Sequence, residues 1–222
     1  MNPSLLQPLS IGVLASGEGT TLEGIAQGIA EHGIPARIVL VVSDREGAPV
    51  VDRARRAGLP VAVLPVRGTE REAWARELTR LLRTHGVQLV VLAGFLAILP
   101  EGWVEEWRGR AINLHPSLLP RYGGRGMHGL RVHAAVLAAG DRETGAAVHI
   151  VTNEVDGGPV LGQDRIEVRP ADTPESLRDR LRPIEIRLMI ETIRRFALGE
   201  LALPYPVAAS AGAASASKSR TG

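Results

Sequence analysis

Two polar side chains that can do chemistry stand at the end of a short apolar segment. Asn113 and His115 occupy alternate positions after Ala111 and Ile112, and Pro116 follows at once. Alternate residues of an extended strand point to the same face, and proline cannot continue the hydrogen bonding of a sheet. The pattern therefore predicts a strand whose exposed end presents an amide and an imidazole together. This is the layout of a reactive site, although such residues at strand ends also serve purely structural roles.

A carboxylate completes a candidate acid–base group. Asp156 lies in the segment 152–159, whose glycines and proline indicate a tightly bent loop. A carboxylate beside an imidazole raises the pKa of the ring and fixes its orientation. An amide beside them can donate to an oxyanion. Asn113, His115 and Asp156 together therefore suit an acyl transfer that needs no nucleophile from the protein.

Two other chemistries fit these residues less well. A serine nucleophile at Ser117 would need a Gly-x-Ser-x-Gly turn, which the chain lacks. A metal site built from His115, His128 and His133 matches no familiar ligand spacing, and the chain has 0 cysteines to complete it. We therefore expect no resident metal.

A glycine-containing segment near the start of the chain is suited to hold an anion. Gly17, Gly19, Thr20 and Thr21 follow an apolar segment and precede a helical pattern. Glycines let the backbone approach a ligand, and a helix N-terminus supplies free N–H groups. A dinucleotide fingerprint would need a small residue where Leu22 stands, and no Gly-Lys-Ser/Thr of a Walker loop follows. We predict a monophosphate site, with a tight structural turn as the alternative.

Composition and charge set outer limits on the function. The 222 residues are 45% hydrophobic, which is enough for a full core. No apolar run is long enough to span a bilayer, and residues 1–10 carry no secretory signal. The 26 basic and 24 acidic residues are interspersed and form no basic patch. We expect a cytoplasmic protein that binds neither membranes nor nucleic acid.

Apolar and amphipathic segments alternate along the chain. Short apolar runs predict buried strands, and 3.6-residue periodicity predicts helices. The predicted strands cover residues 10–15, 36–42, 61–64, 89–93, the segment that ends at His115, 146–151 and 164–168. The predicted helices cover residues 20–31, 48–57, 69–84, a tryptophan-containing segment after Pro100, 128–139 and 174–198. This alternation predicts an α/β fold with a mostly parallel central sheet flanked by helices, whose ligands bind at the carboxyl ends of the strands.

Several local features refine this arrangement. Thr69 and Glu72 have the spacing of a capping box at the start of a helix. The glycine-rich segment 122–129 is a candidate mobile loop. We expect a single domain over residues 10–203, a short N-terminal extension at 1–9, and a disordered tail at 204–222 that is rich in Ala, Ser and Gly.

Four motifs resemble those of a known enzyme family. They are Ser16–Leu22, Leu92–Phe95, Asn113–Pro120 and Asp156–Pro159. In order and spacing, over roughly residues 10–200, they resemble the phosphoribosylglycinamide formyltransferase family, the folate-dependent glycinamide ribonucleotide transformylases. Asn-x-His-Pro-Ser-Leu-Leu-Pro with a downstream Asp-Gly-Gly-Pro is highly specific for formyltransferases that use 10-formyltetrahydrofolate.

The resemblance implies a Rossmann-like formyltransferase fold and a reaction. A formyl group would pass from the co-substrate 10-formyltetrahydrofolate to the amine of glycinamide ribonucleotide in de novo purine biosynthesis, by direct attack through a tetrahedral intermediate. His115 would be the catalytic acid, Asn113 would bind the formyl oxygen, and Asp156 would sustain the charge on His115 and help pass the amine proton through water. We expect a monomer or a homodimer whose partners are these two small molecules.

By position, the resemblance also assigns binding residues. Those expected to contact the ribonucleotide are Gly19, Thr20, Thr21, Arg182 and Glu185. Those expected to bind folate are Arg71, Leu96, Ala97, Ile98, Leu99, Asn113, Thr152, Asn153, Glu154, Val155 and Asp156. Ala97, Ala147 and Asn153 replace side chains that are usual in the family, so folate contacts there are less defined. The region Gly123–Gly129 is longer than in better-known members.

Three rival functions remain. Methionyl-tRNA formyltransferase resembles this core but adds a C-terminal tRNA-binding domain, and formyltetrahydrofolate hydrolase adds an N-terminal regulatory domain. The short segments that flank the predicted domain favour neither. A non-catalytic nucleotide-binding module would use the glycine segment with Asp44 as a ribose acceptor, and Leu22 argues against it.

Overall fold

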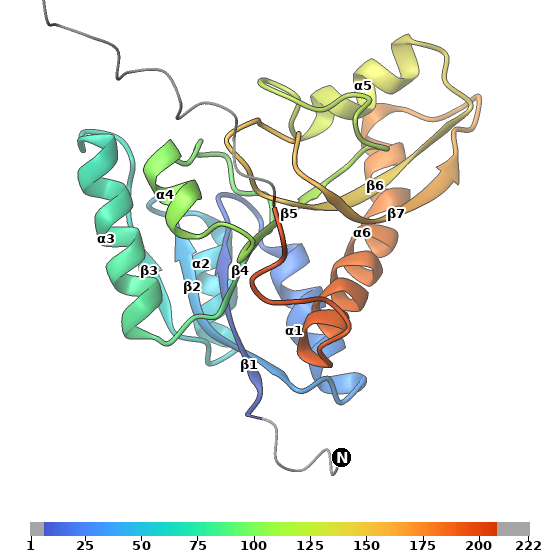
Figure 1. Cartoon of the computed structure of the whole chain (residues 1–222). Coiled ribbons are helices and arrows are strands. Elements are labelled where there is room, and N and C mark those ends of the chain that lie inside the picture. Colours follow the sequence, from blue (N-terminus) through green and yellow to red (C-terminus); the bar gives the residue numbers. More distant parts are fainter. Residues whose placement is uncertain (1–6, 208–222) are drawn as a thin grey trace, which may run out of the picture.

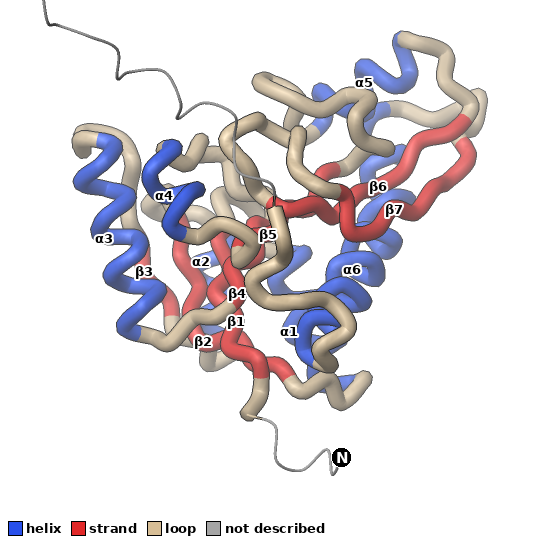
Figure 2. The backbone as a smooth tube through the Cα atoms, viewed as in Figure 1, coloured by secondary structure: helices blue, strands red, loops and turns tan. Residues whose placement is uncertain are grey.

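Strands and helices alternate through most of the computed structural model, which describes residues 7–207. The strands are β1 (Leu9–Leu14), β2 (Ala36–Ser43), β3 (Val61–Val63), β4 (Leu89–Leu92), β5 (Ala111–His115), β6 (Glu143–Ile150) and β7 (Val160–Glu167). The helices are α1 (Thr20–Glu31), α2 (Pro49–Arg56), α3 (Arg71–Thr84), α4 (Glu101–Glu106), α5 (Leu130–Ala138) and α6 (Pro174–Ala197). Figures 1 and 2 show these elements arranged around one central sheet.

The sheet has seven strands in the order β3-β2-β1-β4-β5-β6-β7. The five strands β1 to β5 are parallel to one another, whereas β6 and β7 are antiparallel to their neighbours. The predicted α/β fold with a mostly parallel sheet is therefore confirmed. The chain leaves β1 toward one edge of the sheet and returns at β4 toward the other. Such a reversal creates a crevice at the carboxyl ends of the strands, where ligands of α/β proteins bind.

Helices cover both faces of the sheet, and each face has its own core. Helices α1, α2 and α6 pack on one face through residues such as Ile25, Val51 and Ile193. Helices α3 and α4 lie on the other face (Figure 1). They contribute Trp74 and Trp103 to its core. Strands β1 and β4 are wholly buried because helices cover both of their faces. Their mostly apolar sequences follow from this burial.

Helices α1 and α6 approach each other closely because α1 presents glycines to α6. A Cβ atom on Gly28 would lie 2.2 Å from Cδ1 of Ile190, and one on Gly24 would lie 2.7 Å from Ile186. A larger residue at either position would force the facing isoleucine to move. The close packing brings the middle of α6 next to the start of α1, at the carboxyl edge of the sheet.

Several predicted boundaries were wrong; β6, for example, begins at Glu143, three residues before the expected start at residue 146. Helix α3 is capped by Glu70, whose carboxylate accepts hydrogen bonds from the amides of Glu72 and Ala73, so the capping box expected from Thr69 does not form. Helix α5 begins at Leu130 instead of residue 128, after Gly129 with a φ of 57°. Strand β7 begins at Val160, four residues earlier than expected, and its alternating exposure is typical of an edge strand.

The segment after α6 folds back onto the body of the domain. Leu201, Leu203, Tyr205 and Val207 pack against the core, and the amide of Tyr205 donates to the carbonyl of Gly109 at 2.8 Å. The tail expected from residue 204 thus begins with packed residues, and residues 208–222 lie outside the part that the structure describes, as do residues 1–6 of the predicted N-terminal extension. Within residues 7–207, no helix combines the length and apolarity needed to cross a membrane.

Candidate active site

Strand β5 delivers Asn113 and His115 to the carboxyl edge of the sheet. The strand pairs with β4 on one side and with β6 on the other, so its position is fixed from both sides. Asn113 is half-buried, and His115 is only 4% exposed. The structure therefore places the amide and the imidazole at the same end of one strand, as the sequence predicted.

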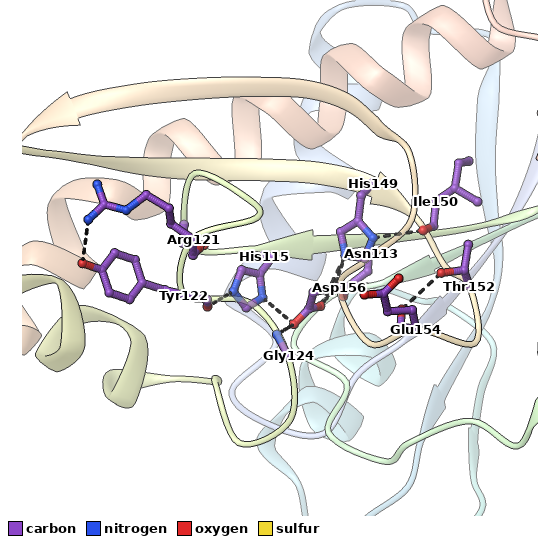
Figure 3. A network of polar contacts seen from close by, with 11 residues as sticks. Asn113, His115, Arg121, Tyr122, Gly124, His149, Ile150, Thr152, Glu154 and Asp156 are labelled. Atoms are coloured by element: carbon purple, nitrogen blue, oxygen red, sulfur yellow. Dashed lines mark hydrogen bonds and ion pairs between the residues drawn. The ribbon is translucent and has the colours of Figure 1, made fainter.

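Asp156 reaches this pair from the loop between β6 and β7. The loop is tightly bent: Asp156 has a φ of 57°, and a Cβ atom on Gly158 would lie 1.9 Å from the carbonyl oxygen of Ile150. Oδ2 of Asp156 lies 3.5 Å from Nδ1 of His115, and its Oδ1 accepts a hydrogen bond from Nδ2 of Asn113 at 3.3 Å. The loop geometry thus aims the carboxylate at both side chains of β5 (Figure 3).

The segment between β5 and α5 closes over His115 and Asp156. Nε2 of His115 lies 2.8 Å from the carbonyl oxygen of Tyr122, and the amide of Gly124 donates to Oδ2 of Asp156 at 2.9 Å. Tyr122 itself is held by a hydrogen bond from its hydroxyl to Asp141 at 2.7 Å. The glycine-rich segment is therefore the third part of the chain, after β5 and the Asp156 loop, that contacts His115 and Asp156.

His149 is a member of the same polar group that sequence reasoning missed. It lies on β6 directly opposite Asn113, and it is 2% exposed. Its Nε2 lies 3.0 Å from Nδ2 of Asn113 and 3.4 Å from Oδ1 of Asp156. The only sequence signal was a histidine inside an apolar strand, and its pairing with Asn113 depends on the antiparallel register.

Burial controls the protonation of the pair. It lowers the pKa of His115 below its ordinary value, and it outweighs the opposing effects of the Asp156 charge and the Tyr122 carbonyl. The carboxylate thus acts to raise the pKa of His115, as expected, but burial has the larger effect. Burial acts to raise the pKa of Asp156, but the polar surroundings supplied by His149, His115 and the Gly124 amide outweigh burial and hold that pKa below its ordinary value. At neutral pH the ligand-free protein thus holds a neutral imidazole beside a carboxylate.

The glycine segment after β1 forms the start of helix α1. Gly19 caps the helix with a φ of 79°, and no side chain occupies the N-terminal amides of α1. A Cβ atom on Gly19 would lie 2.8 Å from Cα of Val50, so only glycine allows this close approach to α2. The carbonyl of Gly17 accepts from the amide of Val50 at 3.0 Å, which fixes the loop. Free amides on a fixed loop are suited to an anion.

One cavity of about 560 Å³ joins these features. A volume of this size is typical of small-molecule sites. The predicted site residues that line it are Gly19, Thr20, Thr21, Leu96, Ala97, Ile98, Leu99, Asn113, His115, Thr152, Asn153, Glu154, Val155, Asp156, Arg182 and Glu185. Arg71 does not line the cavity, but its guanidinium donates to the carbonyl of Ile98, which does. His133, His149 and Arg178 also line it and were not predicted as ligand-binding residues.

The two ends of the cavity differ in chemistry. At one end, α6 contributes Arg182 and Glu185 beside the glycine loop, and burial raises the pKa of Glu185 to about 7 against the opposing charge of Arg182. At the other end, Leu96 and Ile98 expose 40% and 42% of their surface. The loop 152–156 adds the polar side chains of Thr152, Asn153 and Glu154 to this end, and the amide of Asn153 donates to Glu105 at 2.8 Å.

The structure weakens the alternative sites. The hydroxyl of Ser117 is fully buried and donates to the carbonyl of Arg121 at 2.6 Å. Within residues 7–207, no group of three or more histidine and acidic residues is placed to hold a metal ion. Asp44 lines a different cavity from the glycine loop, next to Arg45.

The fold and the site define a doubly wound α/β protein in which Asn113, His115 and Asp156 lie in one cavity with the glycine loop at the start of α1 and the segment 96–99. Residues 9–193 match the family model described as formyl transferase. The chain therefore belongs to the formyl transferase family.

Within this family, the chain is similar to proteins named phosphoribosylglycinamide formyltransferase or glycinamide ribonucleotide transformylase. The chain is 36% identical over 185 residues to the chloroplastic phosphoribosylglycinamide formyltransferase of Arabidopsis thaliana, covering 82% of this chain and 63% of that protein. It is 37% identical over 194 residues to the phosphoribosylglycinamide formyltransferase of Escherichia coli, covering 87% and 89% of the two chains. The crystal structure of glycinamide ribonucleotide transformylase 1 from Symbiobacterium toebii matches with a TM-score of 0.82 and 38% identity, covering 88% and 91%. This chain thus spans less than two thirds of the Arabidopsis protein.

Proposed function

We propose that the protein transfers the formyl group of 10-formyltetrahydrofolate to the amine of phosphoribosylglycinamide, a step of de novo purine biosynthesis. The observation that carries the proposal is the position of His115, Asn113 and Asp156 within one cavity with the glycine loop at the start of α1 and the segment 96–99. The names of the Arabidopsis and Escherichia coli relatives support the same reaction.

The ribonucleotide occupies the polar end of the cavity in this proposal. Its phosphate accepts hydrogen bonds from the amides at Gly19, Thr20 and Thr21, where the helix N-terminus favours negative charge. Arg182 and Glu185 contact the rest of the ribonucleotide from α6. Because Glu185 has a pKa of about 7, its carboxyl group can both accept and donate hydrogen bonds to hydroxyl groups.

The folate co-substrate occupies the other end. Its ring system packs against the segment 96–99 and the loop 152–156, both of which line the cavity. Arg71 acts there through the carbonyl of Ile98, which it holds in place. This arrangement places the two substrates on opposite sides of His115, so that the amine and the formyl carbon can meet beside it.

The chemistry follows from a neutral imidazole beside a carboxylate. The amine attacks the formyl carbon, and the tetrahedral intermediate develops an oxyanion that accepts a hydrogen bond from Asn113. His115 takes up the proton that the amine loses, directly or through water, and Asp156 stabilises the resulting imidazolium. The imidazolium stabilises the oxyanion and then returns the proton to the folate nitrogen as the carbon–nitrogen bond breaks. No covalent enzyme intermediate is needed.

The remaining parts of the proposal concern partners and location. The two substrates are the only ligands that the reaction requires, with no resident metal and no nucleic acid. We place the protein in the cytoplasm as a monomer or a homodimer.

An acceptor comparison tests the proposed function. The protein is supplied with 10-formyltetrahydrofolate and with phosphoribosylglycinamide, initiator methionyl-tRNA or water alone, and the release of tetrahydrofolate is followed. We expect rapid release only with phosphoribosylglycinamide, together with one formylated product for each folate released. Turnover with water alone or only with the tRNA would show that the protein is a different formyl transferase.

A further inference from the structure

His149 lies in the acid–base group, yet the proposed reaction gives it no task. It is buried on β6 and faces Asn113 across the antiparallel pair of β5 and β6. Its ring contacts Asn113 and Asp156, and it does not contact the main chain of the glycine-rich segment that holds His115. A buried histidine with two such neighbours can set the orientation of both.

The hydrogen bond on the far side of the ring fixes the tautomer of His149. Its Nδ1 lies 3.0 Å from the carbonyl oxygen of Ile150. A carbonyl oxygen can only accept, so Nδ1 must carry the hydrogen. In the neutral ring, Nε2 is then a bare acceptor that points toward Asn113.

This acceptor determines how the Asn113 carboxamide is turned. Its Nδ2 donates one hydrogen to Nε2 of His149 at 3.0 Å and directs the other toward Oδ1 of Asp156 at 3.3 Å. The second hydrogen bond is the longer and therefore the weaker of the two. An oxyanion that forms in the cavity can take this second hydrogen while the first keeps the carboxamide in place.

We propose that His149 is a positioning residue that holds Asn113 with its N–H group ready for the formyl oxygen. The proposal deepens the formyl transfer proposed above and rests on it. His149 lines the cavity, and in this proposal it acts through the Asn113 carboxamide. Without the Nε2 acceptor, the carboxamide can turn its oxygen toward the reacting carbonyl, where it repels the developing charge.

Two substitutions of His149 separate positioning from packing. His149→Leu fills a similar volume without an acceptor, whereas His149→Gln can place its amide oxygen where Nε2 lies. We expect His149→Leu to lower kcat by on the order of 10²-fold with little change in either KM, because misplacing a catalytic group has an effect of this size. The kcat of His149→Gln should be at least tenfold higher than that of His149→Leu. Thr144→Val is the matched control, since Thr144 is buried on the same strand with an unpartnered hydroxyl, and kcat should not change.

A double-mutant cycle tests whether His149 acts through Asn113. In an Asn113→Ala background, His149→Leu should change kcat by less than threefold, because the group that it positions is already gone. Equal losses in both backgrounds would overturn the proposal, as would a His149→Leu variant with wild-type kcat.

A measurement without substrates separates this inference from the proposed reaction. The ¹⁵N chemical shifts of His149 in the ligand-free protein report which ring nitrogen carries the hydrogen. We expect the Nδ1–H tautomer near neutral pH, and the Nε2–H tautomer would overturn the inference even if formyl transfer is observed. If the acceptor comparison fails while the tautomer is as expected, the proposed reaction fails and the Asn113 contact stands.

Discussion

Nδ1 of His115 lies 3.5 Å from Oδ2 of Asp156, although the two residues come from a parallel strand and from a loop between antiparallel strands. The two side chains are only 5% and 9% exposed. Nε2 of His115 faces the Tyr122 carbonyl, and the Gly124 amide donates to the same Oδ2 of Asp156. The imidazole faces two acceptors, the Tyr122 carbonyl and the Asp156 carboxylate. A neutral ring can donate to only one of them, whereas an imidazolium can donate to both.

Removing the charge of Asp156 should therefore impair proton transfer. We expect Asp156→Asn to lower kcat by roughly 10²- to 10⁴-fold, the usual range for an acid–base group. Because the carboxylate acts to raise the pKa of His115, the substitution should also lower that pKa further. A pH titration of His115 by NMR measures the second effect. Glu143→Gln on β6 serves as the control, since Glu143 pairs only with the exposed Arg165 among the described residues. A kcat of Asp156→Asn equal to that of the control would contradict this role.

The hydroxyl of Thr21 should matter for one substrate only. Thr21 stands in the first turn of α1, lines the cavity, and would donate to the ribonucleotide phosphate. A hydrogen bond to a charged group contributes about 1.5–3 kcal/mol. Thr21→Val should thus raise the KM for phosphoribosylglycinamide about tenfold or more. Steady-state kinetics with each substrate varied in turn provide the check, and an equal rise in the KM for folate would argue against a phosphate site here.

The raised pKa of Glu185 predicts a pH-dependent stability. Its pKa in the folded protein is about 7, above the value of an unburied glutamate. The folded state thus binds more protons than the unfolded state between these two values, so the free energy of unfolding falls as the pH rises through that window. Glu185→Gln should remove this contribution. Thermal unfolding measured at a series of pH values should show that Tm falls less toward pH 8 in the variant than in the wild type. An equal fall of Tm in both proteins would contradict the raised pKa of Glu185.

The turn that carries Asp156 should not tolerate a side chain at Gly158. A Cβ atom there would lie 1.9 Å from the Ile150 carbonyl oxygen, so the loop has to shift. We expect Gly158→Ala to reduce stability by about 1–3 kcal/mol and to lower kcat by moving the carboxylate. Gly102→Ala in α4 is the control, because its added Cβ meets only Glu72 at 3.7 Å, and helix propensity predicts a gain of up to about 1 kcal/mol. Chemical denaturation compares the two variants.

Local sequence was sufficient where local physics decides the structure. Helix α1 was predicted at its exact bounds, because apolar periodicity runs from the glycine loop to the stop at Gly33. The cap of α3 was missed because Glu70 performs a task more often done by Ser, Thr, Asp or Asn. The early start of β7 was hidden by Gly162, which is unfavourable in strands.

Features that depend on tertiary contacts could not be predicted from local sequence. Asn113, His115 and Asp156 could be named from their motifs, but the contact of His149 with Asn113 needs the antiparallel register of β6. The lowered pKa of His115 likewise depends on how completely the chain around Tyr122 and Asp156 buries the ring. Neither the His149–Asn113 contact nor the pKa of His115 can be inferred from the residues next to it in the sequence.

The role of His115 in formyl transfer is tested by the kcat with phosphoribosylglycinamide after its imidazole is removed. His115→Ala should lose about 10²- to 10⁴-fold in kcat while still binding both substrates. His85→Ala is the control, since His85 is exposed at the end of α3 and contacts only the Leu81 carbonyl among the described residues. An unchanged kcat in His115→Ala would show that His115 does not take part in the reaction.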